Sequence, residues 1–110
     1  MKISQEELYK RINNPRRKDL SGLDLNGVDL RRANLNKANL NRADLSAANL
    51  GNADLVDADL IGAKLSGAKL NDADLSKSDL IDADLSKADL SRAKLINANL
   101  SKADLTGAKL

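Results

Sequence analysis

The sequence lacks cysteine, histidine, tryptophan and phenylalanine, and its 110 residues include only one tyrosine, one proline and one methionine. Without cysteine or histidine, the chain cannot form a disulfide framework, a typical zinc site, a thiol nucleophile or a Ser-His-Asp triad. The near absence of aromatic residues removes the stacking surfaces on which proteins hold single-stranded nucleic acid. These absences exclude most common catalytic sites and do not favour a nucleic-acid partner.

Long apolar runs are also lacking. No stretch approaches the roughly 20 apolar residues of a membrane span, and residues 1–10 lack the apolar core of a signal peptide. The length suits a single domain. We therefore expect a cytoplasmic protein that binds no membrane, and the composition gives no reason to expect a cofactor, a metal ion or a small-molecule substrate.

A five-residue repeat fills most of the chain. Every fifth residue from Leu20 to Leu110 is leucine, at 19 of 19 positions. The residue two places earlier is alanine at 15 of 16 positions from Ala33 to Ala108, and the residue between them is Asp, Asn or Lys. Ser78 is the exception among the alanines, and we expect its hydroxyl to bond to a nearby backbone carbonyl.

This period fits neither a straight helix nor a straight strand. Successive leucines would lie about 140° apart around an α-helix, and in a strand they would alternate between its two faces. One buried face results only if the chain bends once per repeat, with Ala and Leu inward and the next two residues in a turn. A chain that bends in one sense every five residues winds into an all-β solenoid whose coils pair as parallel strands.

The repeats from about Asp19 to Leu110 resemble those of the pentapeptide repeat family, whose motif is Ala-(Asp/Asn)-Leu-x-x. The resemblance implies a right-handed quadrilateral parallel β-helix with four repeats in each coil. We accordingly divide the chain into an N-terminal capping helix and linker, residues 1–18, and a pentapeptide-repeat β-helix, residues 19–110. Four lysines depart from the motif at a position that we expect to face outward: Lys64, Lys69, Lys94 and Lys109.

The two ends of the expected solenoid differ. The N-terminal segment carries a capping box, a hydrophobic staple and two apolar residues on one helical face. The residues of this N-terminal cap are Ile3, Ser4, Glu7, Leu8 and Ile12. We expect a short helix over about residues 5–13 that lies over the first coil. The C-terminal end has no evident cap, so the last coil is expected to be open.

Two surfaces are candidates for interaction. An open solenoid end exposes unpaired backbone, so we expect another chain, or a continuation of this one, to cover it. The candidate end-to-end interface comprises Leu95, Leu100, Leu105, Ala108, Lys109 and Leu110. The second surface is a lateral patch of four apolar residues at outward corner positions, which can mark a contact site. Its members are Val56, Ile61, Ile81 and Ile96.

Charge is unevenly distributed. Residues 1–19 carry six basic and three acidic residues (net +3), and residues 20–110 carry twelve basic and thirteen acidic residues (net −1). The basic excess centres on the run Arg16-Arg17-Lys18, and the sequence leaves open whether this run binds an anion. The regularly spaced aspartates, with no cleft expected around them, indicate a solvated surface rather than a catalytic site.

These observations favour a non-enzymatic structural or protein-interaction scaffold, and the regular repeat also suits a consensus-like, designed or truncated repeat protein. Some pentapeptide repeat proteins are thought to mimic DNA and bind DNA gyrase, and this topoisomerase-binding role is one alternative. Lysines that interrupt the outward aspartates do not favour it, and a supercoiling-inhibition assay would separate the two. A targeting or tethering domain of a longer protein is the other alternative.

Overall fold

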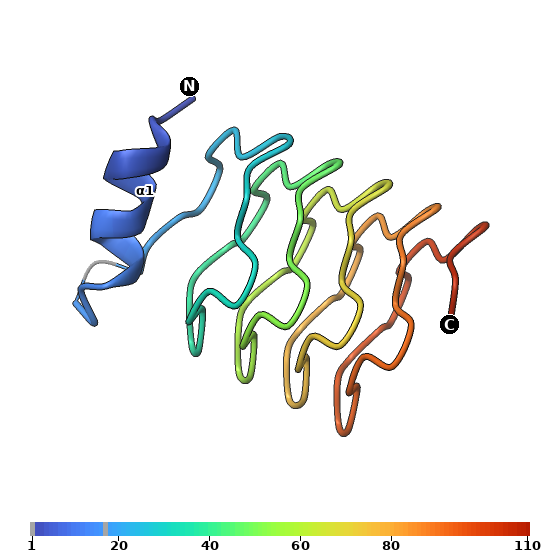
Figure 1. The fold of residues 1–110 in the computed structure, drawn as a ribbon. Coiled ribbons are helices and arrows are strands. Elements are labelled where there is room, and N and C mark those ends of the chain that lie inside the picture. Colours follow the sequence, from blue (N-terminus) through green and yellow to red (C-terminus); the bar gives the residue numbers. More distant parts are fainter. Residues whose placement is uncertain (1, 17) are drawn as a thin grey trace.

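The computed structural model describes residues 2–16 and 18–110. Helix α1, Gln5–Ile12, lies across one end of a stack of coils, and the C-terminus lies at the other end (Figure 1). The molecule measures 32 × 23 × 21 Å. No helix in the described part of the chain is long and apolar enough to cross a membrane.

Each coil of the solenoid contains twenty residues. Outward residues pair in parallel with the residue twenty places later, from Asp19 with Asn39 to Asp89 with Lys109. The chain makes a two-residue turn in every repeat, so that four turns give each coil four sides. Because the turns recur so often, pairing is limited to one isolated parallel bridge per repeat, and the parallel strands that we expected between coils are not continuous strands.

Backbone hydrogen bonds join each repeat to the following coil in the same way throughout. In one such repeat, Leu65 N donates to Asp84 O at 2.7 Å, and Asp84 N donates to Ala63 O at 2.9 Å. At the adjoining turn, Gly67 N donates to Ser86 O at 2.9 Å. This ladder satisfies the backbone groups that winding would otherwise bury without partners.

The second residue of each two-residue turn lies in the left-handed region of backbone conformation. Thirteen non-glycine residues and five glycines adopt φ between 58° and 71° there. Together with its two flanking residues, each turn spans four residues and is closed by a backbone hydrogen bond such as Ala68 N to Leu65 O, 3.0 Å. Positive φ at only the third of these four residues is the pattern of a type II turn. Residues such as Ala47 and Lys87 therefore sit in a conformation that costs a non-glycine residue about 1–2 kcal/mol.

Leucine and alanine ladders fill the interior. Every fifth-residue leucine from Leu20 to Leu90 is at most 3% exposed. Ser78 is also buried, and its Oγ donates to Leu75 O at 2.6 Å, which confirms the expected backbone partner. The core is therefore continuous along the rod, which explains why one leucine in five residues is enough to hold it together.

Helix α1 begins and ends close to the positions expected from the sequence. Ser4 is its N-cap residue, and the Ser4 side chain accepts a hydrogen bond from Glu7 N at 3.0 Å. Leu8 and Ile12 are buried in the same cluster as the leucine ladder, and Ile3 packs partly buried against that cluster. The apolar face of α1 therefore lies on the first coil.

Candidate interaction surfaces

The outward central residue of each repeat closes the turn that follows it. At all fifteen Asp or Asn positions, Oδ1 accepts a hydrogen bond from the backbone amide two residues later, at 2.9 to 3.2 Å. These are Asx turns, in which a side chain mimics a backbone turn. Lysine cannot accept such a bond, so three further turns lack it, those that follow Lys64, Lys69 and Lys94.

Several of these turn-closing carboxylates have a lowered pKa. The Ser46 hydroxyl and then the Ser46 backbone amide stabilise the charged form of Asp44 and lower its pKa, and Ser91 lowers the pKa of Asp89 in the same way. The hydrogen bonds of Arg31 lower the pKa of Asp29 to about 2. Because the bonds are made within single repeats, these shifts have a structural cause and do not indicate a catalytic group.

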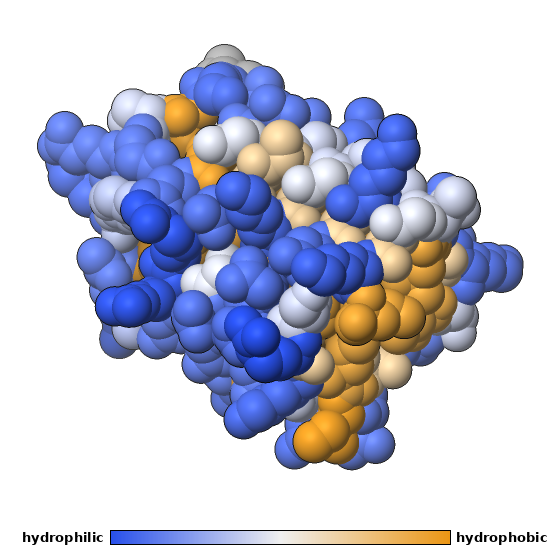
Figure 2. All heavy atoms as spheres, turned by 45° about the vertical axis from the view of Figure 1, so that its right-hand side comes forward, coloured by the Kyte–Doolittle hydropathy of each residue, from blue (hydrophilic) through white to orange (hydrophobic). Residues whose placement is uncertain are grey.

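The last coil exposes both apolar side chains and backbone. Leu110 is 80% exposed and Leu105 37%, whereas the leucines of the same ladder inside the rod are almost fully buried. Ile96, a turn residue of this coil, is 66% exposed. Figure 2 shows apolar surface gathered on the side where this coil lies. Within the described chain, the amides of four leucines there donate no hydrogen bond: Leu95, Leu100, Leu105 and Leu110.

The structure places the residues of the candidate end-to-end interface together on this coil. Leu95, Leu100 and Ala108 are half-buried and pack against the core, and Leu105, Lys109 and Leu110 are exposed. Their apolar members form the outermost layer of the core. The carbonyls of Ala103 and Ala108 accept no bond within the described residues, so the edge presents donors and acceptors alternately.

The lateral patch divides into two parts. Ile61 and Ile81 lie in adjacent coils at one corner, where Gly62 N donates to Ile81 O, and both are half-buried. Val56 and Ile96 lie at the preceding corner, with Ser76 in the coil between them. Since Ile96 belongs to the last coil, the structure groups its exposed side chain with the open end.

The opposite end is covered. Lys2 pairs with Asp24, and the Lys2 Nζ donates to Asn26 O at 2.9 Å. Gln5 Nε2 and Tyr9 Oη both donate to Asp29 O at 3.1 Å. Polar contacts therefore surround the buried face of α1. In the basic run, Arg17 lies outside the described residues.

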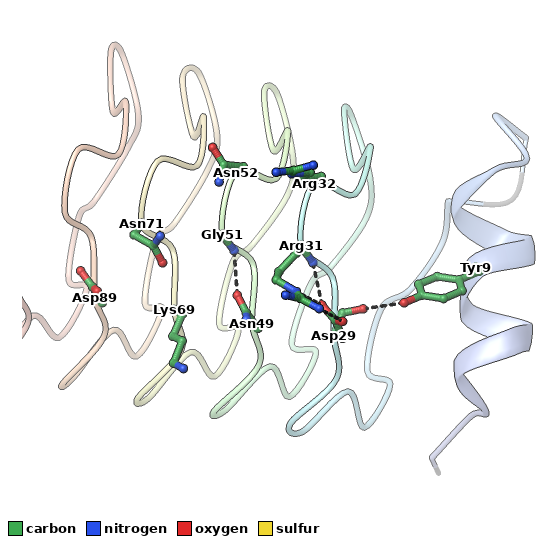
Figure 3. A pocket seen from close by; sticks show the side chains of 10 residues that line it. All are labelled: Tyr9, Asp29, Arg31, Arg32, Asn49, Gly51, Asn52, Lys69, Asn71 and Asp89. Carbon is green, nitrogen blue, oxygen red and sulfur yellow. Dashed lines mark hydrogen bonds and ion pairs between the residues drawn. The ribbon is translucent and has the colours of Figure 1, made fainter.

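A groove that was not predicted from the sequence lies beside α1 (Figure 3). We call it the Tyr9 groove; its volume is about 790 Å³. Its lining residues come from α1 and from residues about twenty apart in successive coils, so only the coil register brings them together. They are Tyr9, Asp29, Arg31, Arg32, Asn49, Gly51, Asn52, Lys69, Asn71 and Asp89. Among the described residues, no cluster of three or more acidic side chains could hold a metal ion.

The chain was compared with models of protein families and with curated proteins. A family model described as Pentapeptide repeats matches in eight copies, over residues 19–52, 38–76 and 73–110. Among curated proteins, no sequence matches the chain significantly.

Solved structures with the same fold include a pentapeptide repeat protein from the thylakoid lumen of Arabidopsis thaliana. It is 36% identical with a TM-score of 0.80, and the match covers 84% of this chain and 65% of that one. A pentapeptide repeat protein of the cyanobacterium Cyanothece 51142 is 26% identical with a TM-score of 0.78, and the match covers 96% and 95%.

A third structure is HetL of the cyanobacterium Nostoc sp. strain PCC 7120, a pentapeptide repeat protein involved in the regulation of heterocyst differentiation. It is 39% identical with a TM-score of 0.57, and the match covers 82% of this chain and 39% of HetL. The chain thus spans less than two thirds of the Arabidopsis and Nostoc proteins and nearly all of the Cyanothece protein.

Proposed function

Since the chain belongs to the pentapeptide repeat family, we propose that it is a non-enzymatic scaffold that binds proteins and pairs with a second copy through its last coil. The observation that carries the proposal is the difference between its ends. One end is closed by buried Leu8 and Ile12, and the other exposes Leu105, Leu110 and unpaired amides. The involvement of HetL in regulation supports an interaction role of this kind.

In this proposal residues 1–18 act as the N-terminal cap and linker, and residues 19–110 form the right-handed solenoid. Helix α1 blocks coil-to-coil stacking at its end, so a second copy has access only to the last coil. Contact between two equivalent coil faces is isologous and closes at a dimer. A head-to-tail contact would instead extend into a filament, which α1 prevents.

The edge of the last coil is suited to pairing with a copy of itself. Each side presents a leucine amide as donor and an alanine carbonyl as acceptor, such as Leu105 N and Ala103 O. A two-fold axis reverses the direction of the second edge, so donors on one copy meet acceptors on the other in an antiparallel pair. Pairing would also bury Leu105, Leu110 and Ile96.

Light scattering after size exclusion, over a hundredfold range of concentration, tests the pairing. We expect a discrete species of twice the 11.8 kDa chain mass. The double variant Leu105→Asp/Leu110→Asp should be a folded monomer, because both side chains are exposed. The control Asn26→Asp/Ser46→Asp adds the same charge on the side of the rod and should remain dimeric. A wild-type monomer at every concentration would contradict the proposal, and so would equal effects of the two double variants.

A further inference from the structure

The Tyr9 groove is lined in part by a glycine that the backbone conformation does not require. Gly51 occupies the first position of its turn and does not adopt a positive φ, so a side chain would be conformationally permitted. It is the only glycine at that position among the eighteen turns. An added Cβ would lie 3.3 Å from Asn49 Oδ1 and 3.5 Å from Asn71 Oδ1. Gly51 is buried, so these two amide side chains lie against its backbone and form the floor of the groove there.

Only some of the charged side chains in the groove have a hydrogen-bond partner. Arg31 holds Asp29 through two bonds, Nε to Oδ1 at 2.9 Å and a terminal guanidinium nitrogen to Oδ2 at 2.8 Å. Asp89 accepts from Ser91 N at 2.9 Å and from Ser91 Oγ at 2.6 Å. Within the described chain, the side chains of Arg32 and Lys69 make no hydrogen bond or ion pair. The two charged side chains of the groove that lack a hydrogen-bond partner are therefore both positive.

From this arrangement we infer that the Tyr9 groove binds an extended acidic peptide segment of a partner protein. Arg32 and Lys69 lie two coils apart, which is about 10 Å along the rod at the parallel strand spacing. Lys69 is also displaced across the coil from Arg32, so the full separation exceeds this spacing. Every second side chain of an extended peptide lies on the same face, so acidic side chains four residues apart, about 13 Å, point the same way and reach both cations. Side-chain amides, which donate and accept, suit the peptide backbone between them.

The same groups disfavour a nucleic acid. Asp29 and Asp89 flank the two cations, so a ligand with evenly and closely spaced phosphates would place some of them against carboxylates. The single aromatic residue of the groove, Tyr9, is 43% exposed and its hydroxyl is bonded to Asp29 O, so the groove has no row of rings for stacked bases. A peptide with two acidic residues brings only the carboxylate at Lys69 near a second carboxylate, that of Asp89 in the next coil.

This inference rests on the proposed interaction role but uses a surface away from the last coil. Loss of peptide binding and loss of dimerisation are therefore separate results, measured by different methods. If the rod pairs but takes no peptide, only the groove assignment fails.

The test is a fluorescence anisotropy titration with a labelled, end-blocked peptide of eight residues, threonine throughout except for glutamate at the third and seventh positions. Arg32→Gln and Lys69→Gln should each raise the Kd by about three- to fivefold, as expected for exposed ion pairs. Gly51→Ser, whose Cβ would lie 3.3 Å from Asn49 Oδ1 and 3.5 Å from Asn71 Oδ1, displaces these amides and should also weaken binding.

The chain supplies matched controls. Arg42 has the same turn position and φ as Arg32, 59° against 60°, and Lys64 occupies the central position of its repeat as Lys69 does. Arg42→Gln and Lys64→Gln should leave the Kd within about twofold. Equal weakening by all four variants would reduce the binding to general charge attraction and overturn the inference. It would also be overturned by the absence of saturable binding, by equal binding of the peptide with lysine in place of glutamate, or by tighter binding of a single-stranded oligonucleotide.

Discussion

The turn-closing role of the outward Asp and Asn residues gives the sharpest stability prediction. Asn39 Oδ1 accepts a hydrogen bond from Asn41 N at 3.0 Å, in a half-buried setting, whereas Lys69 at the equivalent position of its repeat has no acceptor. Asn39→Ala removes one neutral hydrogen bond and leaves an amide without its partner, a loss of about 1 kcal/mol. Lys69→Ala removes no such bond and should change the free energy of unfolding by less than about 0.5 kcal/mol.

A substitution that adds an acceptor, instead of removing one, should raise the free energy of unfolding. Lys69→Asn supplies the missing acceptor for Asn71 N and should stabilise the protein by about 1 kcal/mol. For a domain of this size, a change of 1 kcal/mol shifts Tm by roughly 4–8 °C. Thermal and urea unfolding followed by circular dichroism measure all three variants. Equal losses for Asn39→Ala and Lys69→Ala, with no gain for Lys69→Asn, would refute the claim that this position closes the turn.

Three further predictions concern the interior, the turns and acid stability. Ala73→Leu forces a larger side chain into a fully buried position and should cost about 1–3 kcal/mol in urea unfolding; an unchanged midpoint would contradict the inward ladder. Lys87→Gly relieves a positive φ of 59° and should raise Tm, whereas Gly67→Ala should lower it. Because the pKa values of Asp44 and Asp29 are lowered in the folded state, their stabilisation is present above about pH 4 and is lost as the pH falls towards about 2. Urea midpoints that stay constant over that range would contradict the assignment.

Most of the fold could be predicted from the sequence because the repeat is local and nearly invariant. One leucine and one alanine in every five residues leave a single consistent winding, and the signals around Ser4 locate α1 because helix capping depends on adjacent residues. The partner of Ser78 followed from its place among buried alanines.

The features that were missed depend on geometry that a one-dimensional pattern does not carry. The outward Asp and Asn residues were interpreted as solvating, because their bonds to the turn amides require the backbone course of the turn. The left-handed φ at residues such as Ala47 and Lys87 was not anticipated, because these residues do not favour it. The Tyr9 groove needs residues about twenty apart to lie beside α1, and Ile96 could be assigned to the open end only once the last coil was placed.

Amide hydrogen exchange at the last coil tests the central claim, that one end of the rod is closed and the other pairs with a second copy. The measurement follows Leu95, Leu100 and Leu105 N–H at low and high protein concentration, with Leu60 N–H, bonded to Asp79 O at 2.8 Å, as the internal reference. We expect the three end amides to become protected as concentration rises, while Leu60 is protected throughout. Rapid exchange of the end amides at every concentration would show that no second copy covers this coil.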